Sequence, residues 1–218
     1  MQYLESISEE RGLALLTDDD LDILSLGISM VGHTEIKMAQ QNPKRGIIAT
    51  TLDERGIEVT NKLIKEAGLE SQITTKLEDV TKLMPYEDNS FDFVYSRLCL
   101  HYIDDNGMKH ALSEMRRVLR SGERAFLVLQ SDKRREGKKL NEKFIPETGM
   151  TQYLSTIHKE IRQRRFYSQE DFIKVNKESG LQIISMSEYK ELLCTNYDRT
   201  TRSPEPDGLL EVVLKKTI

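Results

Sequence analysis

Short apolar runs alternate with helix-like stretches along most of the chain. The runs "DILSLG" (22–27), "GIIATT" (46–51), "QITTKLED" (72–79), "SFDFVYSR" (90–97) and "RAFLVLQ" (124–130) have the length and content of strands, most of them buried. The stretches between them favour helices, because their apolar residues recur at helical spacing or they carry capping signals. These helical stretches are 33–40, 53–69, 108–120 and 167–180.

The order of these elements predicts an α/β fold. Alternating strands and helices form a mostly parallel sheet that is covered on both faces. The last two strands, "LQIISMSEYK" (181–190) and "GLLEVVLKK" (208–216), have no helix between them, so we expect the final strand to run antiparallel as part of a hairpin. In the stretch 167–180, Ser168 is expected to cap the helix and Tyr167 to pack on Phe172.

Ligands of such sheets bind outside the carboxyl ends of the strands, near the point where the strand order reverses. We therefore expect the loops after Leu26, Thr51, Leu77 and Ser96 to surround one crevice.

Composition restricts the classes of function. Of the 218 residues, 38% are hydrophobic and 31% are charged, as in globular proteins, and the net charge of -4 makes a nucleic-acid partner unlikely. The segment "MQYLESISEERG" lacks the apolar region of a secretory signal, and no run approaches the ~20 apolar residues of a membrane span. The two cysteines, Cys99 and Cys194, are expected to be small buried residues, and no metal site is expected. These features indicate a cytoplasmic protein.

The expected organisation is one domain over residues 1–218. Residues 1–20 form a short N-terminal segment, and the charged segment 131–166, which shows no strand pattern, is expected as an insertion over the site. Its basic stretches, 133–139 and 162–165, could contact nucleic acid or an acidic partner, although such runs are more often a solvated face.

A family resemblance enters with the central segment "LEDVTKLMPYEDNSFDFVYSRLCLHYIDDNGMKHALSEMRRVLRSGERAFLVL". It resembles the middle of class I S-adenosylmethionine-dependent methyltransferases, most closely the small-molecule group that includes ubiquinone and menaquinone biosynthetic enzymes. "FYSQEDFIKVNKESGLQIISMSEY" is similar to the penultimate helix and strand of that family. The resemblance covers about residues 21–130 and 166–214. It implies a Rossmann-like seven-stranded fold with an antiparallel last strand, and S-adenosylmethionine as cofactor.

The first cofactor motif of the family is altered in this chain. It consists of an acidic residue, an apolar one and then Gly-x-Gly-x-Gly. Here Ser25 stands at the acidic position, Gly27 keeps the first glycine, and Ser29 and Val31 replace the other two. Those glycines allow positive φ and close approach of the ligand, and a β-branched residue suits that conformation poorly. Val31 is therefore expected either to leave positive φ and narrow the pocket or to be strained.

The other cofactor positions are mixed. The family's acidic residue for the ribose hydroxyls, at the end of the second strand, corresponds to Thr51, with Asp53 two residues late. The acidic residue for the adenine amino group is kept as Asp79, for which a turn or helix cap is the alternative interpretation. The resemblance also places Val80 and Ser96 at the cofactor. Each charge-assisted hydrogen bond contributes roughly 1.5–3 kcal/mol, so cofactor binding is expected to be weak or lost.

Two candidates for catalysis follow the fourth strand. His101 and Tyr102 in "LCLHYI" could face the methyl group, or this stretch could simply pack a short helix beneath the site. Two functions stay open. The first is a divergent methyltransferase acting on a small molecule. The second is a non-catalytic protein of the same fold that serves as a binding or regulatory partner.

Overall fold

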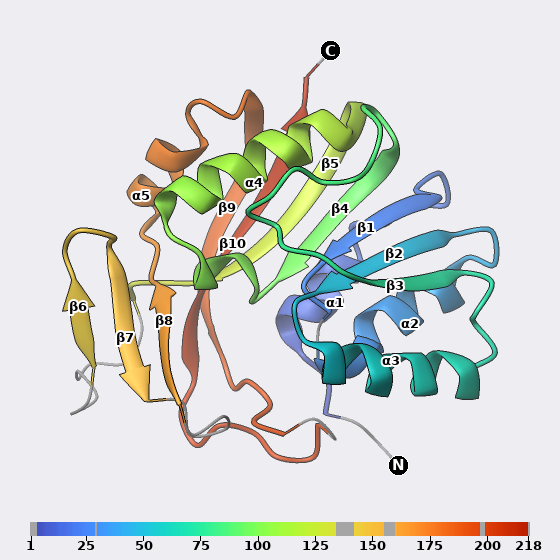
Figure 1. The fold of residues 1–218 in the computed structure, drawn as a ribbon, viewed down its shortest axis with the longest axis horizontal. Helices are drawn as coiled ribbons and strands as arrows, with labels where there is room; N and C mark the ends of the chain where they lie inside the picture. The colour runs from blue at the N-terminus through green and yellow to red at the C-terminus, as the bar shows by residue number, and fades with distance from the viewer. Residues whose placement is uncertain (1–3, 29, 134–141, 155–159, 197–198, 218) are drawn as a thin grey trace.

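The computed structural model describes residues 4–28, 30–133, 142–154, 160–196 and 199–217. Ser29 and most of the basic stretch 133–139 lie outside the described residues. A seven-stranded sheet forms the centre, in the order β3-β2-β1-β4-β5-β10-β9 (Figure 1). Its strands are β1 (Asp22–Leu26), β2 (Gly46–Thr51), β3 (Ile73–Leu77), β4 (Phe91–Arg97), β5 (Leu119–Gln130), β9 (Leu181–Glu191) and β10 (Asp207–Lys216).

The strand directions agree with the prediction from sequence. The pairs β1–β2, β2–β3, β1–β4 and β4–β5 are parallel, and β10 is antiparallel to both β5 and β9. The four apolar runs 22–27, 46–51, 90–97 and 124–130 therefore all lie in one sheet. The predicted α/β fold, mostly parallel with an antiparallel last strand, is confirmed.

Five α-helices of the described chain cover the two faces of the sheet (Figure 1). Core residues of α1 (Ile7–Leu13), α2 (His33–Gln41) and α3 (Glu54–Glu66) share one buried cluster, and those of α4 (Asp105–Val118) and α5 (Gln169–Asn176) share another. Two short 3-10 helices, η1 (Met30–Gly32) and η2 (Leu100–Tyr102), follow β1 and β4.

The first strand shows why the two faces separate. In β1, Ile23 belongs to the cluster under α1, α2 and α3, whereas Leu24 and Leu26 belong to the cluster under α4 and α5. All three side chains are buried because successive residues of a strand point to opposite faces of the sheet. The order β2-β1-β4 also makes the carboxyl ends of β1 and β4 the point where the strand order reverses.

The helix α5 begins as predicted. Ser168 Oγ accepts a hydrogen bond from the backbone nitrogen of Asp171 at 3.0 Å, and the rings of Tyr167 and Phe172 meet edge to face with centroids 6.4 Å apart. Both the cap and the hydrophobic staple are confirmed.

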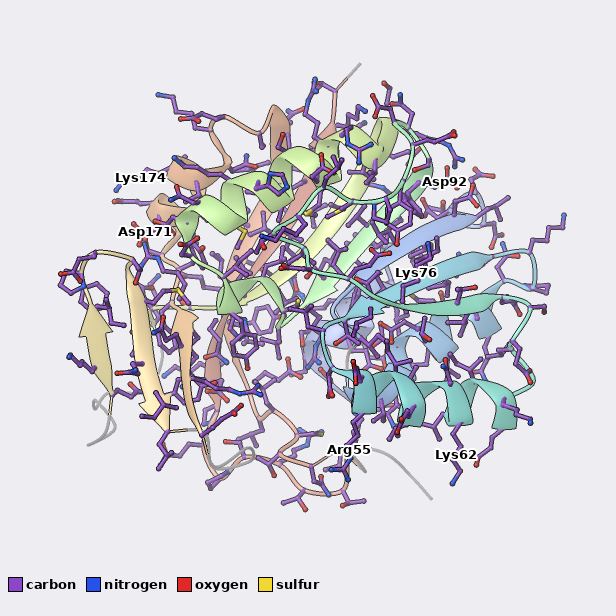
Figure 2. The ribbon with its side chains drawn as sticks, in the orientation of Figure 1. Arg55, Lys62, Lys76, Asp92, Asp171 and Lys174 are labelled. Carbon is purple, nitrogen blue, oxygen red and sulfur yellow. The ribbon has the colours of Figure 1, made fainter. Side chains whose placement is uncertain are left out.

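One strand begins earlier than its apolar run. The helix α4 ends at Val118 and β5 starts directly at Leu119. The residues "RSGE" (120–123) are therefore part of the strand and lengthen it at its amino end. The β4–β5 register shifts between Phe91 and Phe93 to accommodate the extra residues, and Gly122 takes a φ of 88° there. Arg120 in this bulge forms ion pairs with Asp22 and Asp92, which lie at the amino ends of β1 and β4, opposite the predicted crevice. Asp92 is labelled in Figure 2.

The segment 131–166 contains strands that the sequence did not predict. A separate three-stranded sheet consists of β6 (Lys143–Ile145), β7 (Met150–Leu154) and β8 (Ile161–Arg165). Its apolar pattern is hidden because arginine side chains pack on aromatic rings, as Arg164 does 4.2 Å from the centroid of Tyr153. Charged residues thus occupy strand positions that are usually apolar, so the apolar pattern used to predict strands is missing.

No helix of the described chain is long and apolar enough to cross a membrane.

A buried arginine joins the start of β2 to the surrounding segments. The guanidinium of Arg45 donates hydrogen bonds to the carbonyl oxygens of Asp20 at 2.8 Å, Met38 at 2.7 Å and Thr17 at 2.8 Å. Its charge is therefore shared among three backbone acceptors, and Nη1 also donates to Gln41 Oε1 at 3.1 Å. The adjacent Lys44 is exposed.

We expect Arg45→Met to lower the free energy of unfolding by roughly 2–4 kcal/mol, because it removes these bonds and leaves buried carbonyl groups unpaired. The matched variant Lys44→Met removes the same charge from an exposed position and should change it by no more than about 0.5 kcal/mol. Denaturant unfolding of the three proteins measures both values. Equal stability of the two variants would contradict the role given to Arg45.

Candidate functional site

The carboxyl ends of the parallel strands surround a cavity of about 590 Å³. Its walls come from the loops after β1, β2 and β3 and from the segment after β4, as the strand order predicts. The lining residues are Gly27, Thr50, Thr51, Leu52, Asp53, Arg55, Glu78, Asp79, Val80, Cys99, Tyr102, Ile103 and Arg162. We call this space the first cavity.

Gly27 begins the loop after β1 and has little room beside it. Its φ is 81°, in the left-handed region, and a Cβ atom placed on it would lie 2.5 Å from the Sγ of Cys99. Both the conformation and the close approach therefore require glycine at this position. The backbone nitrogens of Gly27 and Ile28 bond to the carbonyl oxygen of Thr50 at 2.9 and 2.8 Å, which fixes the loop against β2.

Val31 keeps the backbone conformation that the family's glycine would take. Its φ is 63° and ψ is 30°, so a buried β-branched residue occupies the left-handed region. Of the two expected outcomes, the structure has the strained one rather than a departure from positive φ. Gly32 follows with a φ of 79° and begins α2. Ser29, the other altered glycine position, lies outside the described residues.

Two predicted cofactor residues turn away from the first cavity. Ser25 is buried in β1, and its Oγ donates a hydrogen bond to Glu35 Oε1 of α2 at 2.6 Å. Ser96 is buried in β4, and its Oγ donates to the carbonyl oxygen of Leu26 at 3.1 Å. Neither residue is among those that line the cavity. The carboxylate next to Ser25 is that of Glu35, which belongs to α2 and not to β1.

The loop after β2 brings two residues to the cavity. Thr51 and Asp53 both line it, and the backbone nitrogen of Asp53 donates to Thr51 Oγ1 at 3.2 Å. The turn between them is short, so the carboxylate that the sequence places two residues late still reaches the same wall. Arg55 lines the cavity from the first turn of α3 (Figure 2).

Asp79 both caps a turn and lines the first cavity. Its Oδ1 accepts hydrogen bonds from the backbone nitrogen of Thr81 at 2.9 Å and from Thr81 Oγ1 at 2.7 Å. These two bonds lower the pKa of the Asp79 carboxyl, which is therefore ionised at neutral pH. The residue caps a turn and also lines the same cavity as Gly27 and Thr51, as Val80 does.

His101 and Tyr102 form the short helix η2. His101 is 1% exposed, its Nδ1 has no hydrogen-bond partner among the described residues, and its ring centroid is 4.3 Å from that of Tyr102. Burial, and secondly the charge of Arg164, lowers the pKa of His101 to about 3, so the imidazole is neutral at pH 7. Tyr102 lines the first cavity, whereas His101 lines a neighbouring one.

Several lining residues were not predicted from sequence. Glu78 lines the cavity directly before Asp79 and accepts a hydrogen bond from Tyr86 Oη at 2.6 Å. The triplet "LED" could have indicated it, because two acidic residues there follow the strand directly. Cys99 is half-buried rather than fully buried and touches the cavity where Gly27 approaches it. Arg162 reaches the cavity from β8, and only the fold of the segment 131–166 brings it there.

The lining chemistry suits a polar organic molecule rather than a metal ion. The carboxylates of Asp53, Glu78 and Asp79 can accept hydrogen bonds from hydroxyl and amino groups, and Val80 and Ile103 offer apolar contact. Within the described parts of the chain, no group of three or more His, Cys, Asp or Glu residues is arranged to hold a metal ion. The residues present therefore fit a nucleoside-containing cofactor.

Comparison with known proteins also finds similarity to enzymes that use a nucleoside-containing cofactor. Residues 26–127 match the family model described as "Methyltransferase domain". A 27-O-demethylrifamycin SV methyltransferase of Amycolatopsis mediterranei (strain S699) is 30% identical over 96 residues. That match covers 44% of this chain and 34% of the relative, so the chain spans about a third of the length of the curated relative it matches.

Solved structures share the fold at low sequence identity. A SAM-dependent methyltransferase of Methanosarcina mazei has a TM-score of 0.69 at 15% identity, covering 94% of this chain and 96% of that one. A geranyl diphosphate methyltransferase in complex with SAM has a TM-score of 0.66 at 15% identity, covering 96% and 81%. Residues 26–127 are therefore similar to methyltransferase domains, and nearly the whole chain shares its fold with these solved S-adenosylmethionine-dependent methyltransferases.

Proposed function

We propose that this protein binds S-adenosylmethionine in the first cavity and transfers its methyl group to a small molecule. The observation that carries the proposal is the convergence of the Asp53, Glu78 and Asp79 carboxylates beside Gly27, at the carboxyl ends of parallel strands. The proposal is also supported by the methyltransferase named above that was solved with SAM.

The roles of the lining residues follow from their chemistry. Asp79 and Val80 would hold the adenine, Thr51 and Asp53 the ribose hydroxyls, and the loop at Gly27 the amino-acid end of the cofactor. The cofactor would provide an electrophilic methyl group on a sulfonium. Thr51 stands where the family has a carboxylate, and Val31 is strained. The protein should therefore bind S-adenosylmethionine more weakly than it would with the family's motifs.

His101 and Tyr102 are proposed to orient the accepting group. Methyl transfer is an in-line displacement, so alignment of the nucleophile contributes more than a strong base. The neutral imidazole of His101, with Nδ1 unpaired in a buried position, can hydrogen-bond a hydroxyl of the acceptor. The hydroxyl oxygen would form a bond to the methyl carbon as the bond from that carbon to sulfur breaks. S-adenosylhomocysteine would leave, and the proton of the hydroxyl would pass to water.

The remaining expectations belong to the same proposal. Residues 1–218 are proposed to act as one domain, with the short N-terminal segment 1–20 and with 131–166 lying over the site, which is supported by the lining position of Arg162. A small molecule is the proposed partner. A cytoplasmic location stays a prediction.

Cofactor affinity tests the proposal directly. We expect calorimetric titration with S-adenosylmethionine and S-adenosylhomocysteine to give dissociation constants weaker than low micromolar. The variant carrying Ser29→Gly, Val31→Gly and Thr51→Asp should bind at least about tenfold more tightly, because it restores a carboxylate and relieves the loop. The control Thr74→Asp makes the same change at an exposed position of β3 outside the first cavity and should leave affinity unchanged.

Low-micromolar binding by the unmodified protein, with no gain in the variant, would contradict the altered-loop interpretation. Absence of binding in both proteins would favour the alternative, a non-catalytic binding or regulatory protein.

Gly27 gives a second test. We expect Gly27→Ala to weaken cofactor binding at least tenfold, because the added methyl group would displace Cys99 in the cavity wall. Gly68→Ala is the matched control, since Gly68 has a similar φ of 69° but no atom within 4 Å of an added Cβ. Both substitutions should lower stability by about 1 kcal/mol through the left-handed backbone, and Gly27→Ala should lower it further because of the contact with Cys99. Equal cofactor affinity of the two variants would contradict the role of Gly27.

The neutral state of His101 has a measurable consequence. Its pKa of about 3 in the folded protein lies below the ordinary 6.5, so unfolding takes up a proton between these values. Its contribution to stability is therefore complete above pH 6.5 and is lost as the pH falls towards 3. We expect His101→Gln to flatten the pH dependence of the free energy of unfolding in this window, measured by denaturant titration. The exposed His110→Gln should leave the dependence unchanged.

A further inference from the structure

A second cavity, of about 470 Å³, adjoins the first. The two share Gly27, Thr51, Cys99 and Tyr102 as lining residues, so they meet at the loop after β1 and at η2. The second cavity extends from there towards the end of β5, the strand β8 and the loop between β9 and β10. Apolar walls come from Ile28, Leu98 and Leu193.

The charge of the second cavity differs from that of the first. Three arginines line it, Arg97, Arg164 and Arg199, and Asp207 is the one acidic residue of the lining. Each arginine also lies within 4.0 Å of a glutamate outside the lining, Glu191, Glu142 and Glu9 respectively. In contrast, the first cavity has three carboxylates and two arginines, Arg55 and Arg162. The lining of the second cavity is therefore the more positive of the two and favours an anionic group more strongly.

Two of the three arginines are already occupied. Arg97 donates to the hydroxyls of Ser6 and Ser8 at 2.7 Å each, with Glu191 at 3.9 Å. Arg199 lies 2.5 Å from Glu9. These pairs hold α1 and the β9–β10 loop against β4. Arg97 and Arg199 therefore stabilise the fold whether or not a ligand is bound.

Arg164 also has a glutamate partner, but it keeps one unpaired donor. Its Nη2 is 3.4 Å from Glu142 Oε1, while its Nε is buried without a hydrogen-bond partner among the described residues. The guanidinium stacks between the rings of Tyr153 at 4.2 Å and Phe166 at 4.9 Å, which fixes its plane. A fixed guanidinium with a free donor is suited to bind a carboxylate.

Two further unpaired polar atoms belong to residues of the same cavity. His101 Nδ1 and Gln130 Oε1 are buried without partners among the described residues, in side chains only 1% and 4% exposed. A buried polar atom without a partner costs roughly 1–3 kcal/mol, so three such atoms in residues that line one cavity favour a ligand that pairs them. The amide oxygen of Gln130 can only accept a hydrogen bond, which requires a donor on that ligand.

We propose that the second cavity is the acceptor subsite and that it takes a small hydroxy acid with an apolar group. Arg164 binds the carboxylate, Gln130 and His101 contact the hydroxyl, and the apolar group lies against Ile28, Leu98 and Leu193. The assignment of this space to the methyl acceptor rests on the proposed function, whereas binding of the acid rests on the cavity itself.

Mandelate is the probe, because it combines a carboxylate, a hydroxyl and a phenyl group. Mandelamide lacks the charge and phenylacetate lacks the hydroxyl. In calorimetric or ligand-observed NMR titrations of the full chain, we expect mandelate to bind at least tenfold more tightly than either. Arg164→Gln should weaken mandelate at least tenfold, towards the affinity of mandelamide. The control Lys174→Gln makes the same charge change on α5, at a residue that lines neither cavity, and should have no effect.

Gln130→Glu is the second variant, for the case in which Arg164→Gln does not fold. It keeps the shape of the side chain, places a negative charge in the cavity and should also weaken mandelate at least tenfold. Equal binding of the three probes, no binding at millimolar concentration, or unchanged mandelate affinity in the folded variants would overturn the subsite.

Titration of the same proteins with S-adenosylmethionine separates the two proposals. Cofactor binding without mandelate binding overturns the subsite and leaves the proposed function. Mandelate binding that depends on Arg164, without any cofactor binding, supports the acid site and overturns the proposed function.

Discussion

The central constraint on this structure is that β1 is enclosed on all sides. It is hydrogen-bonded to β2 along one edge and to β4 along the other, and helices cover both of its faces. Asp22 at the start of the strand is exposed, but the four residues from Ile23 to Leu26 are buried. A ligand can therefore reach the chain only where it leaves the strand. That exit is the loop at Gly27, where the strand order reverses and where neighbouring loops converge. The first cavity is a direct result of this arrangement.

The altered cofactor motif is a redistribution of polar groups more than a loss of them. Ser25 has no carboxylate of its own but bonds to that of Glu35 on α2. Thr51 has none either, yet Asp53 lines the same cavity after a short turn. The backbone at Val31 keeps the left-handed conformation of a glycine loop at the cost of strain in a β-branched residue. At Gly27 and Val31 the backbone therefore has the left-handed conformation of a glycine loop, although the residue at position 31 is valine.

The two cavities divide the chemistry between them. Carboxylates gather in the first and arginines in the second, and the short segment around Cys99 and Tyr102 belongs to both. The small sheet β6–β7–β8 contributes an arginine to each, Arg162 to the first and Arg164 to the second, because residues two apart on a strand point to the same face. A molecule in one cavity would therefore be held next to a molecule in the other.

The sequence by itself determined the fold class, because its apolar periodicity and strand–helix order leave few arrangements that bury every apolar face. It also located the crevice and several of its residues, among them Gly27, Thr51 and Asp79, because they follow strands directly. Only the tertiary structure decided that Ser25 and Ser96 face away from the cavity, since hydrogen bonds to distant partners fix them. It also decided that the charged segment 131–166 forms strands and brings Arg162 and Arg164 to the site, because stacking of arginines on aromatic rings leaves no apolar pattern to read.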